Sequence, residues 1–286
     1  MRFLALPVLL ATAAITGAAA PLPLVIAEPL LAVQGQLLIA SLPAGSRDLR
    51  LDGEALHIDG DGRFMAGVDR DFAGSRRLEW VTPDGRSAHR ELVVTARQWD
   101  IDRLPARLLR PADPDAPRNL EWEARREAEV AQVKAARVEI SPWPFWRTAF
   151  QWPATGRIST HFGSQRFYGD VPASYHGGMD IAAPSGTPVT SPLPGVVRLA
   201  AGPFALEGKI IIIDHGRGLH SAMLHLSRIE VKAGDIVAQG QKIGRIGSTG
   251  RSTGPHLHWG LTWHGIKVDP EALVPPLPTN ATPVGR

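Results

Sequence analysis

The chain has 286 residues, a formal net charge of +3 and no cysteine, and its length is sufficient for two folded domains. The charge comes from scattered arginines rather than a basic block, so the composition gives no support for nucleic-acid binding. Without cysteine the chain has neither disulfides nor a lipid attached through a thiol, and any metal site must use nitrogen and oxygen ligands.

The first twenty residues are typical of an export signal. Arg2 precedes an apolar run from residue 3 to 15, and small residues occupy most of positions 16 to 20, as in a secretory signal peptide. We therefore expect residues 1–20 to direct the protein to the periplasm or another extracytoplasmic compartment. An uncleaved membrane anchor is the alternative, because the apolar run is close to the lower length limit for spanning a bilayer.

Residues 21–104 are expected to form an accessory domain. Short apolar runs such as 36–40 and 64–66 alternate there with turn signals such as Asp52-Gly53 and Asp84-Gly85. Several strands at this spacing indicate a small β-sandwich. No motif in this segment carries chemistry.

Residues 105–149 are interpreted as a linker that contains a helix. After the proline-rich stretch 111–117, residues 119–138 are rich in Ala, Glu and Arg and contain neither Gly nor Pro, which predicts a helix. The expected packing stripe, with Glu and Arg on the outer face, consists of Leu120, Ala124, Ala128, Ala131, Ala135 and Val138.

After the linker the pattern changes to strands separated by glycine-rich turns, for example at 209–214 and 256–262. This predicts an antiparallel β domain over residues 150–274. The tail, residues 275–286, is rich in Pro and Thr and is expected to be disordered. The predicted fold class is therefore mainly β: a β-sandwich-like accessory domain, a linker helix and a C-terminal antiparallel β domain.

Two motifs in the last domain supply side chains suited to binding a metal. His176 and Asp180 are separated by two glycines and a methionine, which predicts a loop that enters a strand. His256 and His258 begin a strand-like stretch, and alternation directs both to one face. A catalytic zinc site uses three protein ligands and leaves the fourth position to water. His176, Asp180 and His258 meet that requirement.

Four blocks of this domain carry a family resemblance. They are residues 175–184 (YHGGMDIAAP), 224–227 (LHLS), 247–258 (GSTGRSTGPHLH) and 268–270 (VDP). In order and spacing they resemble the lysostaphin-type or LytM-like zinc endopeptidases, which cut peptide bonds in bacterial peptidoglycan. The resemblance implies that His176, Asp180 and His258 bind zinc and that His225 and His256 are catalytic histidines that do not bind it.

The chemistry of the residues leads to similar roles. Zinc lowers the pKa of its bound water and polarises the scissile carbonyl, but a base must still accept a proton. The chain has no H-E-x-x-H helix, in which a glutamate would be that base, and histidine is the natural substitute. We expect His256 and, from the resemblance, His225 to orient or deprotonate the water and to stabilise the tetrahedral intermediate, without assigning which does which.

The expected function is hydrolysis of peptide cross-links in peptidoglycan, as a D,D-endopeptidase, by attack of zinc-bound water assisted by two histidines. Two alternatives stay open: a cell-wall-binding or amidase-activator module without hydrolysis of its own, and a toxin-like protease. The order of the domains also suggests that the accessory domain shields the groove. Deleting residues 21–140 would then raise hydrolysis.

The remaining histidines are interpreted by their surroundings. His215 and His264 lie in turn-like sequences and are expected to be structural. His161 and His220 lie in strand-like stretches near the site in sequence. We treat His220, together with Tyr175 beside His176, as a candidate substrate-binding residue.

Overall fold

The computed structural model describes residues 24–25, 29–104 and 119–276. The predicted signal segment (1–20) and most of the predicted disordered tail (275–286) lie outside the described residues. Within the described part of the chain, no helix combines the length and the apolar character needed to cross a membrane. The predicted mainly β class is confirmed, with a single α-helix among the described residues.

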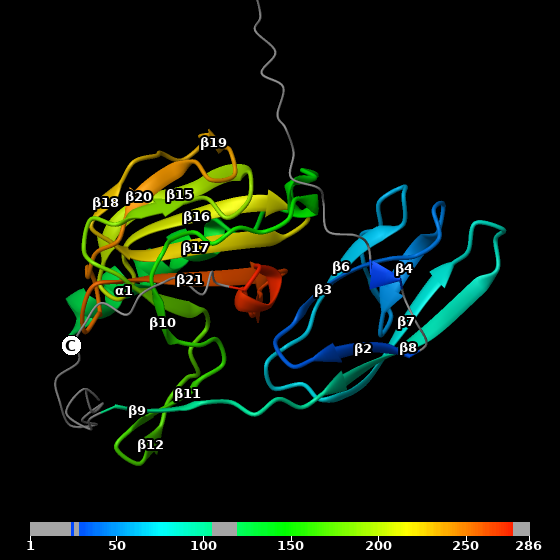
Figure 1. Cartoon of the computed structure of the whole chain (residues 1–286), viewed down its shortest axis with the longest axis horizontal. Coiled ribbons are helices and arrows are strands. Elements are labelled where there is room, and N and C mark those ends of the chain that lie inside the picture. The colour runs from blue at the N-terminus through cyan, green and yellow to red at the C-terminus, as the bar shows by residue number, and fades with distance from the viewer. Residues whose placement is uncertain (1–23, 26–28, 105–118, 277–286) are drawn as a thin grey trace, which may run out of the picture.

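The N-terminal β region, residues 24–104, consists of two sheets (Figure 1). The five-stranded sheet has the order β2(Leu30–Val33), β8(Ser87–Thr95), β7(Gly74–Val81), β4(Arg47–Leu51) and β5(Glu54–Ala55). The three-stranded sheet has the order β1(Leu24–Val25), β3(Leu37–Ser41) and β6(Arg63–Gly67). Their shared core includes Leu38, Phe64, Leu78 and Leu92, each at most 2% exposed.

The C-terminal β region, residues 150–276, is built on an eight-stranded antiparallel sheet. Its strands are, in order, β10(Arg157–Thr160), β13(Met179–Ala182), β21(His256–Trp263), β17(Leu219–Leu226), β16(Gly208–Gly216), β15(Gly195–Phe204) and β19(Ile236–Val237), with β22(Ile266–Val268) also on β21. A small sheet comprises β14(Pro188–Thr190), β20(Lys242–Arg245) and β18(Arg228–Ile229). The run from Ile210 to Ile213 is buried on both faces of β16, because apolar residues pack on each side of the large sheet.

One strand of the N-terminal region continues into the C-terminal region. β9(Ile101–Leu104) pairs in parallel with β11(Gln165–Tyr168), which also pairs with β12(Val171–Pro172). Figure 1 shows β9 extending from the N-terminal sheets to a position beside β11. The N-terminal region therefore supplies β9 as an edge strand of the small sheet with β11 and β12, and this sheet comes shortly before Tyr175 and His176 in the chain.

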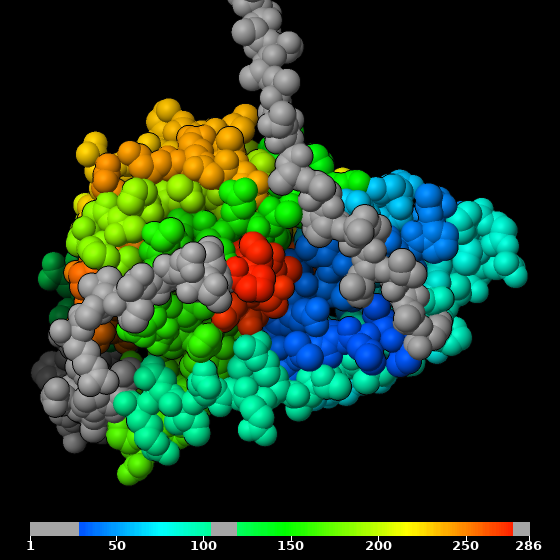
Figure 2. Space-filling model, viewed as in Figure 1, coloured from blue at the N-terminus to red at the C-terminus, as the bar shows by residue number. Residues whose placement is uncertain are grey.

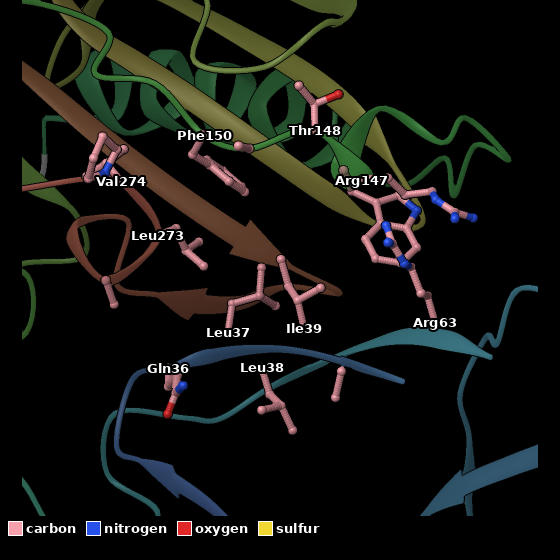
Figure 3. A pocket seen from close by; sticks show the side chains of 15 residues that line it. Gln36, Leu37, Leu38, Ile39, Arg63, Arg147, Thr148, Phe150, Leu273 and Val274 are labelled. Carbon is pink, nitrogen blue, oxygen red and sulfur yellow. The ribbon is translucent and has the colours of Figure 1, made fainter. Parts of the chain in front are cut away.

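Strand β3 lies between the two hydrophobic cores. Leu37 belongs to the core of the C-terminal region and Leu38 to that of the N-terminal region, since successive side chains of a strand point to opposite faces. Figure 3 shows Leu37 and Ile39 directed toward Phe150 and Leu273, and Leu38 directed away from them. In Figure 2 the red C-terminal segment, which includes η3(Glu271–Leu273), lies at this junction.

The predicted helix is observed as α1(Leu120–Ala135), but its predicted packing stripe is wrong. The alanines of that stripe are exposed, and Leu120 is 66% exposed. The packed face instead includes Glu129, Val133 and Ala136. Alanine buries little apolar area, whereas the Glu129 carboxylate accepts hydrogen bonds from Arg125, Arg126 and the backbone N–H of Ala205. Hydrogen bonding of this kind allows a charged group to be buried.

Candidate metal centre and active site

The three predicted metal ligands meet on two neighbouring strands and the loop before them. Asp180 on β13 lies directly opposite His258 on β21, and His176 precedes β13 by one short turn. Gly178 in this turn has no space for a side chain, because a Cβ there would lie 2.5 Å from the carbonyl oxygen of Trp259 and 2.7 Å from His258 Nε2. The glycines of the His176 motif therefore allow the loop to approach β21.

The donor atoms of this group converge. His176 Nε2 lies 2.9 Å from His258 Nδ1 and 3.0 Å from Asp180 Oδ1, and His258 Nδ1 lies 2.9 Å from the same oxygen. Donors around a tetrahedral zinc ion with bonds of about 2.0–2.1 Å are about 3.3 Å apart. The spacing therefore matches such a site to within a few tenths of an ångström.

The orientation of His176 also fits a metal. Its Nδ1–H donates to the carbonyl oxygen of His161 (3.1 Å), so in the neutral ring Nε2 carries a lone pair. That lone pair faces Asp180 Oδ1, which is itself an acceptor when ionised. A cation between these atoms would be attracted by all of them, and a backbone acceptor on the other ring nitrogen is typical of histidines that bind metals.

Burial and hydrogen bonding set the charges in this group. Burial alone would raise the pKa of Asp180, but the adjacent His176 and His258 rings hold it well below its ordinary value. Burial lowers the pKa of His258 to about 4. An ionised Asp180 and a neutral His258 therefore meet here near neutral pH, which is the protonation state that zinc requires of these two ligands.

Two further histidines lie beside the donor group. The rings of His225 and His256 have centroids 4.8 Å apart, and His256 Nε2 is 3.8 Å from Asp180 Oδ1. His225 Nδ1–H donates to the carbonyl oxygen of Thr249 (2.9 Å), and His256 Nδ1–H donates to that of Gly254 (2.8 Å). In each neutral ring Nε2 is thus left as the proton acceptor.

The backbone of His225 is held in an uncommon conformation. Its φ is 63°, which is rare for residues other than glycine, and its N–H donates to the carbonyl oxygen of Glu207 (2.9 Å). Burial lowers the pKa of the His225 imidazole, which favours the neutral ring. Such backbone outliers are enriched at functional sites.

A groove of about 580 Å³ contains all five of these side chains. Its wall also includes charged and polar groups that the sequence did not predict: Asp102, Arg166, Tyr168, Glu207 and Arg251. Arg251 lies within the GSTGRSTGPHLH block, so the motif itself was a signal for it. Asp102 lies far from the motifs in sequence and reaches the groove only through the pairing of β9 with β11.

The two predicted substrate-binding residues do not line the groove. His220 is 2% exposed at the far end of β17, where its Nδ1–H donates to the carbonyl oxygen of Gly218. The Tyr175 ring packs against Arg70 and Phe162 in the domain junction. Proximity to His176 and His225 in sequence was misleading, because neighbouring side chains can point to opposite sides of a strand or loop.

The other histidines also lie outside the groove. The exposed ring of His161 pairs with Glu271, and His264 is in the turn between β21 and β22. His215 is fully buried at the end of β16, not in an exposed turn. Its Nδ1–H donates to the carbonyl oxygen of Pro194 and its Nε2 accepts from Ser221 Oγ, so both ring nitrogens are used in contacts within the fold.

We expect His215 to make stability depend on pH. Burial lowers its pKa in the folded protein to about 4, so the unfolded chain binds more protons between pH 4 and the ordinary value. The contribution of neutral His215 to the free energy of unfolding is fully present above about pH 6.5 and falls by about 3 kcal/mol as the pH drops to 4. Urea unfolding of wild type and His215→Gln at fixed zinc concentration should show their stability difference shrinking over this window. Parallel curves would contradict the assignment, and His89→Gln, at an exposed histidine on β8, is the control.

A second cavity of about 440 Å³ lies at the junction of the two regions (Figure 3). It is lined mainly by apolar groups, including Leu37, Phe150 and Leu273, with Arg63 and Arg147 at one side. Among the described residues that line it there is no histidine or carboxylate. The histidines and carboxylates of the candidate site therefore line the groove around His176 and not this cavity.

Fold and groove together define the class of protein. A β-rich domain that combines a His-Asp-His donor group with two further histidines in one groove has the side chains that metal-assisted hydrolysis requires. Residues 174–270 match the model of peptidase family M23. These 97 of the 286 residues are the part of the chain that is similar to the family.

Related proteins extend this result. Over 115 residues the chain is 43% identical to peptidoglycan DD-endopeptidase ShyA of Vibrio cholerae, covering 40% of this chain and 26% of that protein. It is 38% identical over 122 residues to DD-carboxypeptidase/endopeptidase Mpg of Neisseria gonorrhoeae, covering 43% and 28%. The chain therefore aligns with only about a quarter of the length of these curated relatives.

A solved structure resembles more of the chain. A putative peptidase M23 from Pseudomonas aeruginosa is 27% identical, with a TM-score of 0.63, and the match covers 87% of this chain and 96% of that one. A match of this extent includes strands of the N-terminal β region as well as the peptidase domain. The likeness to this solved structure therefore extends beyond residues 174–270.

Proposed function

We propose that this protein is a zinc-dependent endopeptidase that hydrolyses peptide cross-links in bacterial peptidoglycan, as a D,D-endopeptidase. The observation that carries the proposal is the convergence of five predicted side chains in one groove, with three donor atoms 2.9–3.0 Å apart. Relatives named as peptidoglycan DD-endopeptidases support the choice of substrate. The division into an accessory domain (21–104), a linker (105–149) and a peptidase domain (150–274) belongs to the same proposal.

His176, Asp180 and His258 would hold the zinc ion. Bound there, zinc would acidify a water molecule and polarise a peptide carbonyl. The role of the three side chains is to hold the ion with one negative charge and two neutral rings. The hydrogen bond from His176 Nδ1–H to the carbonyl oxygen of His161 keeps His176 Nε2 directed at the other two ligand atoms.

His225 and His256 would transfer protons. Each ring is oriented by a backbone acceptor on Nδ1, so Nε2 can accept a proton from the attacking water and later return it to the departing amine. The second ring, protonated from solvent before the attack, would donate a hydrogen bond from Nε2 to the carbonyl oxygen that becomes negatively charged. The two rings are close enough to divide these tasks.

The groove suits an anionic peptide. The exposed side chain of Arg251 lies in the wall beside the two histidines, and guanidinium groups bind carboxylates in a bidentate manner. The peptides of peptidoglycan carry free carboxylates. Action on this substrate requires an extracytoplasmic location, which the predicted signal segment would provide.

Digestion of cross-linked peptidoglycan would test the proposal. Wild type, His258→Ala and a chelated sample with zinc restored would be incubated with the polymer, and the released fragments identified by mass. We expect zinc-dependent conversion of cross-linked dimers to monomers by the wild type alone. Intact dimers despite bound zinc would overturn the proposal in favour of a binding or activator module, and cleavage at another bond would overturn the D,D assignment.

A further inference from the structure

We propose that Arg70, in the N-terminal β region, is a positioning residue for the metal centre of the C-terminal region. This inference rests on the proposed role of His176 as a zinc ligand. Arg70 follows β6 and is 8% exposed, so its guanidinium is almost entirely inside the protein. It contacts the segment 161–164, which in turn holds His176.

The Arg70 guanidinium donates two hydrogen bonds to one carbonyl group of the segment 161–164. Arg70 Nε and Nη2 both donate to the carbonyl oxygen of Gly163, at 3.0 and 2.8 Å, while Nη1 donates to Asp71. Gly163 is itself buried, with φ at 79°. A Cβ at Gly163 would lie 2.2 Å from the Trp99 ring, so the turn is inserted tightly between Arg70 and Trp99.

The segment 161–164 forms three hydrogen bonds with His176. The N–H of Gly163 donates to the carbonyl oxygen of His176 (2.9 Å), and the N–H of His176 donates to that of Ser164 (2.9 Å). The carbonyl oxygen of His161 accepts from His176 Nδ1. Position and ring orientation of His176 therefore both depend on where this turn lies.

Aromatic contacts connect Arg70 to the other side of the ligand. The Arg70 Cζ is 4.9 Å from the centroid of the Tyr175 ring and 5.0 Å from that of Trp99. Phe162 packs edge-on against both rings. Tyr175 is the residue before His176, so one guanidinium contacts both this residue and the turn that is hydrogen-bonded to His176.

Loss of the guanidinium would leave the Gly163 carbonyl without its charged donors and would leave a space beside Tyr175. A buried carbonyl without a donor is costly, and the turn would shift to find another partner. The ligand His176 would shift with it. On this basis the N-terminal region supports the metal centre, in contrast to the shielding role suggested by the order of the domains.

Zinc affinity of the purified protein, measured by competition with a chromophoric chelator, would test the proposal. We expect Arg70→Ala to weaken zinc binding by about 10–100-fold, as for other groups that orient metal ligands. The cobalt-substituted protein should also show shifted visible absorption bands, because these report ligand geometry. Arg70→Lys keeps the charge and one donor, so it should restore part of the affinity and serves where Arg70→Ala does not fold.

Arg147→Ala is the matched control. Arg147 also joins the two regions, through ion pairs with Asp59 and Asp61, and lies at the other cavity. The substitution Arg147→Ala should lower the free energy of unfolding and leave zinc affinity and the cobalt spectrum unchanged. Wild-type affinity in Arg70→Ala, or equal weakening in both variants, would overturn the proposal. Weaker zinc binding by Arg70→Ala alone would support the positioning role of Arg70, whether or not wild type cuts peptidoglycan. Failure of wild type to cut peptidoglycan would count only against the proposed function.

Discussion

Asp180→Asn is expected to abolish hydrolysis by removing zinc from the site. Asp180 is the one anionic member of the donor group and lies 2.9 and 3.0 Å from the two histidine nitrogens. The amide keeps the shape of the side chain but removes the negative charge that balances the cation. We expect zinc affinity to fall by more than the roughly 10–100-fold seen when only a partner of a ligand is lost. Zinc competition and peptidoglycan digestion at buffered zinc would measure both effects.

The same substitution at an exposed aspartate provides the comparison. Asp170 is in the turn between β11 and β12, with its side chain fully exposed, and Asp170→Asn should bind zinc and hydrolyse as wild type does. Retention of wild-type zinc affinity by Asp180→Asn would mean that the carboxylate is not a ligand. Thermal unfolding of the zinc-free proteins would separate loss of the metal from loss of the fold.

Local sequence pattern predicted the strands better than their pairing. The runs around residues 36–40, 209–214 and 256–262 were recognisable as strands, because alternation and β-branched residues are local signals. The parallel pairing of β9 with β11 joins residues more than sixty positions apart, and no turn signal connects them. Contacts of this kind are determined by the packing of whole sheets, and a single sequence does not display them.

The helix illustrates a different limit. Its position was predictable from the absence of glycine and proline, but its packed face was not. The stripe of alanines offered little apolar area. The buried face depends on Glu129, which accepts hydrogen bonds from Arg126 on the same helix and from the backbone N–H of Ala205 in the turn after β15. Propensity therefore located the helix, whereas hydrogen bonding across elements determined its orientation.

At the candidate site, the residues within motifs were predictable from the sequence, but the residues that position them were not. His176, Asp180 and His258 were found because each lies in a short motif of chemically suitable residues. Arg70 was not found, because its link to the site is a hydrogen bond to a backbone carbonyl 93 residues away. A backbone acceptor is not visible in the sequence, since every residue type carries a carbonyl group.

Replacing His225 or His256 by alanine is expected to reduce hydrolysis strongly while zinc stays bound. Each ring offers Nε2 as a proton acceptor beside the donor group, and neither supplies one of the three converging ligand atoms. Loss of one proton-transferring group typically costs about 10²–10⁴-fold in rate. We expect kcat to fall in each variant with zinc content unchanged, measured on a defined cross-linked peptide and by metal analysis.

The double variant distinguishes shared from separate roles of these histidines. If both rings act in one proton-transfer sequence, removal of the second should add little to the loss caused by the first, because groups that act as a unit are not additive. His264→Ala, at the turn between β21 and β22 and outside the groove, should retain wild-type rates. Full activity in both His225→Ala and His256→Ala, with zinc bound, would remove the histidines from the mechanism and leave the metal as the source of catalysis. A loss confined to one variant would assign the proton transfer to that ring, and its neighbour 4.8 Å away would then contribute to packing of the groove.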